Sequence, residues 1–244
     1  MNIALAAVGF KNGDISYNKE KIITVIREHR YQADLILFGE TFLQGFNSLS
    51  WNYEKDKDVA ITIDDPVVAE IMKAAKEFSV AVSFGYVEKT EDSLFSSQLT
   101  IGKNGSILDN YRRITIGWKE AVADSHYKEG ECFHTFYFEG KEIAVGLCGD
   151  LWYDENIEQM NKLNPDVVLW PVYTDFNYNE WNNTVINEYS EQVAGVGCGV
   201  CYVNSVCLDR KGEEIAKGGA AYFMDGKIKY QTPAGEESIL YVRV

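Results

Sequence analysis

Short apolar runs alternate with amphipathic segments through the first part of the chain. The runs at residues 3–8, 34–38 and 80–87 are dominated by apolar side chains, which predicts buried strands. Residues 18–31 repeat apolar side chains at helical spacing, and Asp65-Pro66 suits the start of a second helix because Asp caps and Pro fits the first turn. This order predicts an α/β fold with helices packed outside a mixed sheet system.

The remaining pattern predicts hairpins, two further helices and several closing strands. Asn104-Gly105 between apolar runs is a strong hairpin signal. Helices are expected at about 154–163 and 180–196, and Pro171 is expected to close a strand at 166–170. Without repeats or long linkers, residues 1–244 are expected to form a single domain. The other expected strands are 94–101, 107–113, 133–138, 142–148, 200–206, 219–224, 227–230 and 239–242.

Composition and charge narrow the class of partner. The 244 residues carry a formal net charge of −14 with 46% hydrophobic residues, typical of a globular protein. Because acidic surfaces repel phosphate backbones and anionic lipid heads, neither nucleic acid nor membrane is an expected partner. The first residues read as a strand rather than a signal peptide, and no apolar run is long enough to span a bilayer.

The cysteines and histidines point away from disulfides, metals and cofactors. Five cysteines without a spaced framework indicate reduced thiols in a cytoplasmic protein. None of the three histidines pairs with a cysteine at metal-ligand spacing, so no metal is expected. No glycine-rich phosphate loop follows a strand, so no nucleotide cofactor is expected.

Three strand ends carry candidate chemistry, at the edge where open α/β sheets place their sites. Glu40 follows a buried strand, where a carboxylate with a raised pKa suits a general base; an ordinary loop glutamate is the alternative. Arg112-Arg113 lies on a strand, so one arginine can face inward, although a surface pair is the alternative. Cys148 ends an apolar strand before Gly149, which suits an exposed nucleophile; a small buried thiol is the alternative.

Two other thiol mechanisms compete with a carboxylate base at this stage. A Cys–His site with His126 or His134 as the base stays open on residue types alone. A redox thiol is less favoured because no resolving cysteine lies near Cys148 in the sequence.

Together these segments resemble the nitrilase superfamily, in the chain order Glu, cation, Cys. Residues 39–46 are similar to its Glu segment, which ends in glycine and an aromatic residue. Residues 148–155 are similar to its Cys-x-Asp-x-x-x-x-Glu segment, the most specific piece. Residues 111–113 fall where the family carries Tyr-Arg-Lys, and residues 127–130 resemble its Glu-Gly element. The similarity covers almost the whole chain.

The resemblance implies a mechanism and a fold. Cys148 would attack the substrate carbon, Glu40 would act as base, and the backbone near Gly149 with a cation would hold the oxyanion. Glu129 would stand beside the nucleophile as a second carboxylate. The implied fold is a four-layer α-β-β-α sandwich. The implied assembly is a homodimer or higher homo-oligomer, formed through helices such as 154–163 and 180–196, although core packing explains their apolar faces equally well.

The main departure from the family is Arg113 at its catalytic lysine position. Arginine holds an oxyanion but does not release a proton near neutral pH. Lys119 is a possible substitute cation, six residues further along. Gly39 replaces the usual proline, Gly149 replaces a bulkier residue, and Trp152 adds bulk near the nucleophile.

The sequence therefore favours a hydrolase that cleaves the C–N bond of a small amide, with a nitrile or carbamoyl substrate less favoured. The alternative is a catalytically impaired family member that serves as a binding or assembly module. Arg113 at the catalytic lysine position favours this alternative. Tyr173, Asp175, Phe176 and Trp181 are candidates to line the substrate pocket, or equally to pack in the core.

Overall fold

The first of two six-stranded sheets is built mainly from the N-terminal half of the chain. A computed structural model describes residues 1–212 and 215–244. In this sheet the strand order is β14-β1-β3-β4-β5-β6, with β1, β3 and β4 parallel and the outer strands antiparallel to their neighbours. Its strands are β1 (Asn2–Ala7), β3 (Leu35–Phe38), β4 (Ala81–Lys89), β5 (Leu94–Ile101), β6 (Ile107–Arg112) and β14 (Ser238–Arg243).

The second sheet has the strand order β13-β12-β10-β9-β8-β7, with β8, β9 and β10 parallel. A short pair, β2 (Gly9–Phe10) and β11 (Val206–Cys207), runs beside the two sheets and was absent from the sequence predictions. The strands of the second sheet are β7 (Thr135–Phe138), β8 (Lys141–Val145), β9 (Val167–Val172), β10 (Gly199–Asn204), β12 (Ala220–Met224) and β13 (Lys227–Thr232).

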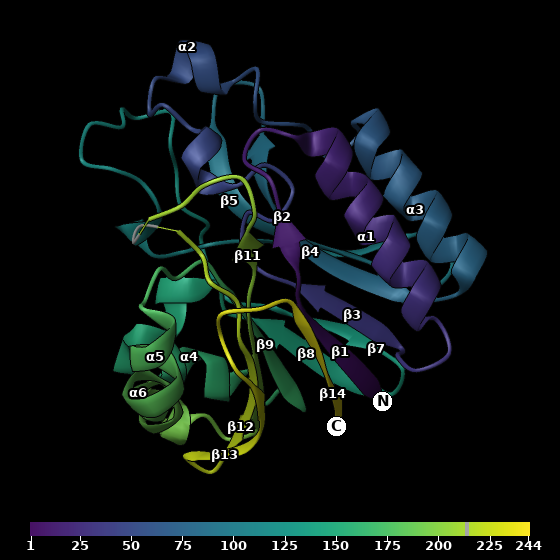
Figure 1. Cartoon of the computed structure of the whole chain (residues 1–244), viewed down its shortest axis with the longest axis vertical. Coiled ribbons are helices and arrows are strands. Elements are labelled where there is room, and N and C mark those ends of the chain that lie inside the picture. Colours follow the sequence, from purple (N-terminus) through teal and green to yellow (C-terminus); the bar gives the residue numbers. More distant parts are fainter. Residues whose placement is uncertain (213–214) are drawn as a thin grey trace.

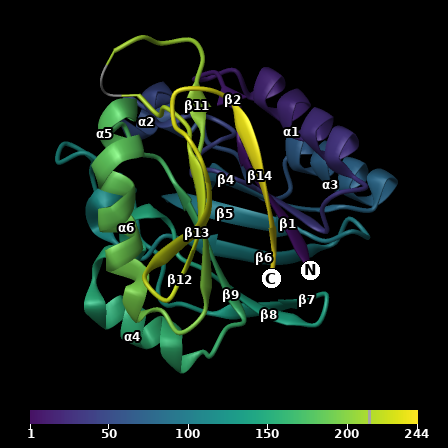
Figure 2. The same ribbon diagram turned by 60° about the horizontal axis from the view of Figure 1, so that its bottom comes forward.

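Apolar side chains fill the space on both sides of the first sheet and also the space between the second sheet and its helices. In β1, Ala4 and Ala6 pack toward the helices α1 (Ile15–His29) and α3 (Pro66–Phe78), whereas Ile3 and Leu5 pack against the second sheet. This is the two-residue alternation of a strand with both faces buried. Helices cover the outer faces of both sheets (Figures 1 and 2). The resulting four-layer α-β-β-α sandwich confirms the predicted fold class.

The two N-terminal helices begin at side-chain caps. Asp65 accepts a hydrogen bond from the backbone N–H of Val67 at 2.9 Å, as the Asp-Pro pair predicted. Helix α1 begins at Ile15, three residues before the predicted start, because Asp14 caps it by accepting from the N–H of Tyr17. The cap therefore extends the helix beyond its apolar stripe.

The helices over the second sheet follow a broken path. The predicted helix at 180–196 is a succession of α5 (Tyr178–Glu180), the π-helical turn η4 (Trp181–Val185), α6 (Ile186–Gln192) and the 3-10 turn η5 (Val193–Gly195). Within the wide turn, Asn182 exchanges two hydrogen bonds with the backbone of Ala234, at 3.1 and 2.8 Å. The inner faces of α4 (Asp154–Lys162) and α6 belong to the core.

Two strand predictions were wrong at their ends. Pro171 lies inside β9, which continues to Val172. The backbone carbonyl of Leu169 points toward β8 and accepts from the N–H of Gly146. The backbone nitrogen of Pro171 points to the same side, but β8 has already ended there. Its missing N–H therefore costs no ladder hydrogen bond. Strand β8 stops at Val145, so Cys148 lies beyond the strand rather than on it.

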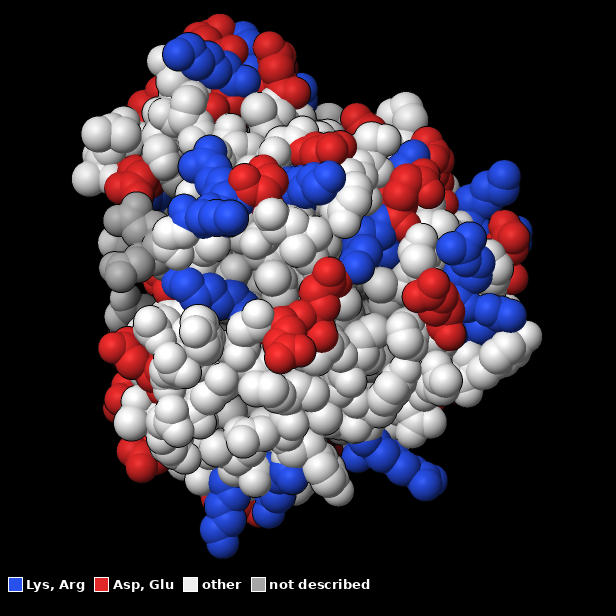
Figure 3. Space-filling view, in the orientation of Figure 1, with Lys and Arg blue, Asp and Glu red and all other residues white. Residues whose placement is uncertain are grey.

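The remaining short elements lie mostly in loops near the carboxyl ends of the strands. Within the described residues, no helix combines the length and apolar composition that crossing a bilayer requires. Figure 3 shows acidic and basic side chains intermixed on one face, and most of them occupy its upper half. The short elements are η1 (Phe46–Ser48), α2 (Tyr53–Asp56), η2 (Ile116–Trp118) and η3 (Cys148–Trp152).

Candidate active site

Glu40 lies where the end of β3 meets the second sheet. Its side chain is buried, and its backbone N–H donates to the carbonyl of Val172 at 3.2 Å, across the two sheets. A Cβ at position 39 would lie 2.5 Å from the Ser205 hydroxyl oxygen. Gly39 therefore permits the close approach of the two sheets that places Glu40.

The two carboxylate oxygens of Glu40 have different surroundings. Oε1 accepts from the Ser96 hydroxyl at 2.9 Å and from Arg113 Nη1 at 3.1 Å. Oε2 is buried and has no hydrogen-bond partner among the described residues. A buried acceptor without a donor is unfavourable, so Oε2 is the oxygen available to take a proton.

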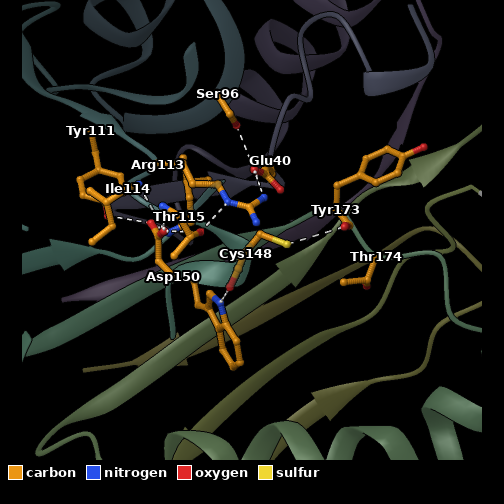
Figure 4. A network of polar contacts seen from close by, with 12 residues as sticks. Glu40, Ser96, Tyr111, Arg113, Ile114, Thr115, Cys148, Asp150, Tyr173 and Thr174 are labelled. Atoms are coloured by element: carbon orange, nitrogen blue, oxygen red, sulfur yellow. Dashed lines mark hydrogen bonds and ion pairs between the residues drawn. The ribbon is translucent and has the colours of Figure 1, made fainter. Parts of the chain in front are cut away.

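Arg113 is a buried, permanently charged partner of this carboxylate. Burial by itself lowers the pKa of the guanidinium, but Glu40, Cys148 and Asp150 around it raise that pKa above its usual value. The side chain is only 5% exposed and faces Glu40 and Cys148 (Figure 4). It supplies a fixed positive charge and does not act as a proton donor.

Cys148 begins the 3-10 helix η3 with a backbone φ of 44°, in the left-handed region. Its Sγ lies 3.8 Å from the Tyr173 carbonyl oxygen, and its own carbonyl accepts from Trp170 Nε1 at 2.8 Å. Burial, together with the Glu40 carboxylate, raises the pKa of the thiol to about 12, while Arg113 acts in the opposite direction. The thiol is therefore protonated at rest and needs a base to react.

Asp150 fixes the backbone on both sides of the site. The carboxylate is fully buried and accepts from the Tyr111 hydroxyl at 2.7 Å and the Leu147 N–H at 3.0 Å. It also accepts from the Thr115 N–H at 3.0 Å and the Thr115 hydroxyl at 2.8 Å. This one side chain ties the segment that carries Arg113 to the turn that carries Cys148 (Figure 4).

Glu40, Arg113 and Cys148 line one cavity of about 580 Å³, which is large enough for a small organic molecule. Tyr173 and Asp175, two of the candidates for a substrate pocket, belong to its wall. The residues that line it are Glu40, Phe46, Asn47, Leu49, Trp51, Arg113, Gly117, Trp118, Glu120, Cys148, Tyr173, Asp175 and Arg210.

Other predicted pocket residues lie outside this cavity. The indole of Trp152 packs against Tyr189, with ring centroids 4.8 Å apart. Phe176 and Trp181 stack on each other at 6.3 Å. Gly149 lies directly behind the Arg113 guanidinium: a Cβ there would be 2.5 Å from Nη2.

Glu129 and Lys119 are brought together, but not into the cavity lining. Lys119 Nζ lies 2.7 Å from Glu129 Oε1 and also donates to the carbonyl of Tyr127. The cation that contacts Glu40 is Arg113. Lys119 instead anchors the loop whose residues Gly117 and Trp118 form part of the cavity wall.

The histidines proposed as alternative bases have other partners. His126 pairs with Asp124 at 2.8 Å, and His134 pairs with Asp109 at 2.7 Å. Neither belongs to the cavity wall that contains Cys148.

Several contributors to the site carried no signal in the sequence. Ser96 comes from the middle of β5, and Thr115 from a loop after β6. Trp51 and Asn47 lie in a region that the apolar pattern left unassigned, and Arg210 lies between the expected strands 200–206 and 219–224. Only the folded chain brings these residues to one place.

The comparison with known proteins agrees with this fold. The model of the carbon-nitrogen hydrolase family matches residues 2–244, and the chain belongs to this family. The chain is 24% identical over 251 residues to the glutamine-dependent NAD(+) synthetase of Acinetobacter baylyi, covering 98% of this chain and 43% of that protein. It therefore spans less than half of that relative's length.

Two further relatives are closer in length to this chain. N-carbamoylputrescine amidase from Oryza sativa subsp. japonica is 24% identical over 222 residues, which is 88% of this chain and 72% of that protein. The crystal structure of an amidase from Nesterenkonia sp. superposes with a TM-score of 0.76 at 15% identity, covering 99% of this chain and 89% of that chain. At that identity the superposition establishes the shared fold.

Proposed function

We propose that this protein hydrolyses the C–N bond of a small amide, with Cys148 as nucleophile, Glu40 as base and Arg113 as the fixed cation. One observation carries the proposal. A single cavity brings together a thiol, a guanidinium and a buried carboxylate oxygen that has no partner among the described residues. These are the groups that nucleophilic acyl transfer requires.

The first half of the reaction forms a thioester. Glu40 Oε2 takes the proton of the Cys148 thiol as Sγ bonds to the carbonyl carbon of the amide, and the carbonyl oxygen becomes an oxyanion. The Arg113 guanidinium stabilises this charge in a buried setting where electrostatic interactions are strong. The C–N bond then breaks, and Glu40 gives its proton to the leaving nitrogen, which departs as ammonia or an amine.

The second half hydrolyses the thioester. Glu40 takes a proton from water, whose oxygen bonds to the thioester carbon. The C–S bond breaks, the proton on Glu40 returns to the sulfur, and the carboxylic acid leaves. In this sequence every transferred proton travels on Glu40, so the inability of Arg113 to release a proton does not block turnover.

Glu129 has an indirect role in this proposal. Through its ion pair with Lys119, it holds the loop at 117–120, which contributes Gly117, Trp118 and Glu120 to the cavity wall. It thereby orients substrate through the loop rather than by touching the reacting atoms.

An amide is favoured as the substrate over a nitrile. One relative is named an amidase, and so is one of the proteins that share the fold. The cavity wall includes Phe46, Trp51 and Trp118, which offer apolar surface to the body of a small amide.

A catalytically impaired binding module is the second candidate function. The observation that favours it is the thiol pKa of about 12, raised by burial, which leaves very little thiolate at neutral pH. On this alternative, Cys148→Ala would bind small amides as the wild-type protein does, and neither would release acid.

The test measures acid and ammonia release from a panel of small aliphatic and aromatic amides, with matched nitriles in parallel. Wild-type protein is expected to release acid from amides. Cys148→Ala is expected to lose at least about 10³-fold in kcat and to keep the wild-type melting temperature. Glu40→Gln is expected to lose a similar factor in kcat while remaining folded, with a lower melting temperature because the buried Arg113 loses its counter-charge. Amide turnover that persists in purified Cys148→Ala would refute the nucleophile assignment.

A further inference from the structure

The three nitrogens of the Arg113 guanidinium have separate surroundings. Nε donates to the Thr115 hydroxyl oxygen at 3.0 Å, and Nη1 donates to Glu40 Oε1 at 3.1 Å. Nη2 finds no acceptor within residues 1–212 and 215–244, although the side chain lines the Cys148 cavity. Two nitrogens thus fix the plane of the group, and the third is left to meet a ligand.

Gly149 provides the space that this orientation needs. A Cβ at position 149 would lie 2.5 Å from Nη2, which is too close, and 3.2 Å from the Thr115 hydroxyl oxygen, which is a tight contact. Gly149 does not occupy the left-handed region, so its backbone alone would accept a side chain. The requirement for glycine therefore comes from the guanidinium beside it.

Thr115 is itself oriented by the carboxylate of Asp150. Its hydroxyl donates its one hydrogen to Asp150 Oδ1 at 2.8 Å, so only oxygen lone pairs face Arg113 Nε. Asp150 is held in turn by Tyr111 and Leu147. The chain of contacts runs without interruption from a buried carboxylate to the guanidinium (Figure 4).

We infer that Gly149, Thr115 and Asp150 are positioning residues that form a seat for arginine at position 113 and aim its Nη2 at the carbonyl oxygen of the amide. The inference rests on the proposed function and adds the reason why arginine stands at this position. The single ammonium of a lysine cannot bond Thr115, Glu40 and substrate from three separate points. Arg113 and Gly149 therefore act as a matched pair.

A double-mutant cycle tests this pairing. Gly149→Ala is expected to lower kcat by about 10–100-fold, with a much smaller change in KM, because the added methyl group displaces a donor used in the transition state. Arg113→Lys is expected to lower kcat as well. In the Arg113→Lys background, Gly149→Ala should cost little more, since lysine leaves that space empty. Equal losses in both backgrounds, or wild-type kcat for Gly149→Ala, would overturn the pairing.

A second pair of variants tests the Thr115 hydroxyl without adding bulk. Thr115→Val keeps the shape and removes the acceptor for Nε, so kcat should fall, while Thr115→Ser should restore most of it. Gly195→Ala is the matched control for Gly149→Ala and should keep the wild-type kcat. Its Cβ would lie 3.5 Å from Ile157 Cγ2, which is an ordinary contact, and Gly195 does not line the cavity. Equal kcat for the valine and serine variants would remove Thr115 from the seat.

Alkylation of Cys148 tests the seat without turnover. Because Arg113 lowers the pKa of the thiol, displacing the guanidinium should slow iodoacetamide labelling of Cys148 at any given alkaline pH. Peptide mass spectrometry separates this signal from exposed Cys132, whose labelling should not change. Unaltered Cys148 labelling in both Gly149→Ala and Thr115→Val would overturn the seat. If the wild-type protein hydrolyses no amide, the proposed function is refuted. The labelling experiment still tests whether Gly149 and Thr115 position Arg113, because it does not depend on turnover.

Discussion

At the scale of single residues, Cys148 combines a strained backbone with a half-buried thiol. Its φ of 44° is unusual for a residue with a side chain, and it persists because Trp170 and the η3 turn hold the peptide on both sides. The strain turns the sulfur toward Tyr173 and the cavity. A thiol placed in this way depends on Glu40 for activation, since burial disfavours its charged form.

The raised thiol pKa predicts how labelling of Cys148 depends on pH. Because the reactive species is the thiolate and the pKa lies near 12, the rate of iodoacetamide labelling should rise about tenfold for each pH unit across the neutral and mildly alkaline range. A rate that levels off between about pH 9 and 10, as it does for an ordinary thiol with a pKa of about 8.5, would contradict the raised pKa. The measurement is peptide mass spectrometry at short labelling times.

At the scale of elements, every reactive group stands at or just beyond the end of a strand. Glu40 follows β3, Arg113 follows β6, Cys148 follows β8, and Tyr173 follows β9. Strands hold their positions rigidly, whereas the residues after them are free to turn inward. The two sheets meet at this edge, so four segments distant in sequence share one cavity.

The end of α3 offers a prediction about stability. Ser79 caps the helix in the left-handed conformation, with φ 55° and ψ 43°, which glycine adopts without steric cost. Ser79→Gly is expected to raise the free energy of unfolding by about 0.5–1 kcal/mol, measured by urea denaturation. The control Lys73→Gly, at an exposed position in the middle of α3, should lower it by about 1 kcal/mol. A destabilised Ser79→Gly would show that the serine side chain contributes more than the backbone strain costs.

At the scale of the whole molecule, contact between the two sheets sets the distance between Glu40 and Cys148. Leu5, Leu37 and Leu169 are fully buried in the layer between the sheets. This layer is close-packed, so a loss of volume there shifts both halves of the site. Catalytic geometry and global stability are therefore coupled through the same side chains.

Leu37→Ala tests the packing of this central layer. The substitution is expected to lower the free energy of unfolding by about 2–5 kcal/mol through the cavity it leaves. Ile116→Ala, at a side chain 71% exposed, should change the free energy of unfolding by less than about 0.5 kcal/mol. Comparable destabilisation by the two variants in urea titrations would contradict the assignment of Leu37 to the central layer.

Much of the fold was predictable because its signals are local. The Asp65-Pro66 cap, the Asn104-Gly105 turn and the apolar runs each act within a few residues, and the structure confirms the elements they predicted. The break at η4 was not predictable, because Asn182 bonds to Ala234, which is distant in sequence. The end of β8 before Cys148 was missed because Gly146 and Leu147 continue the apolar pattern while the backbone already turns.

The sequence by itself determined the family, the layered α/β fold and the residues Glu40, Arg113 and Cys148 as candidates, because motif order and apolar periodicity are properties of the chain. Only the tertiary structure decided which cation meets Glu40, that Lys119 pairs with Glu129 instead, and that Thr115 and Gly149 frame the guanidinium. The physical reason is that an ion pair or a packing contact depends on distance in space. That distance is fixed only when the two sheets close on each other.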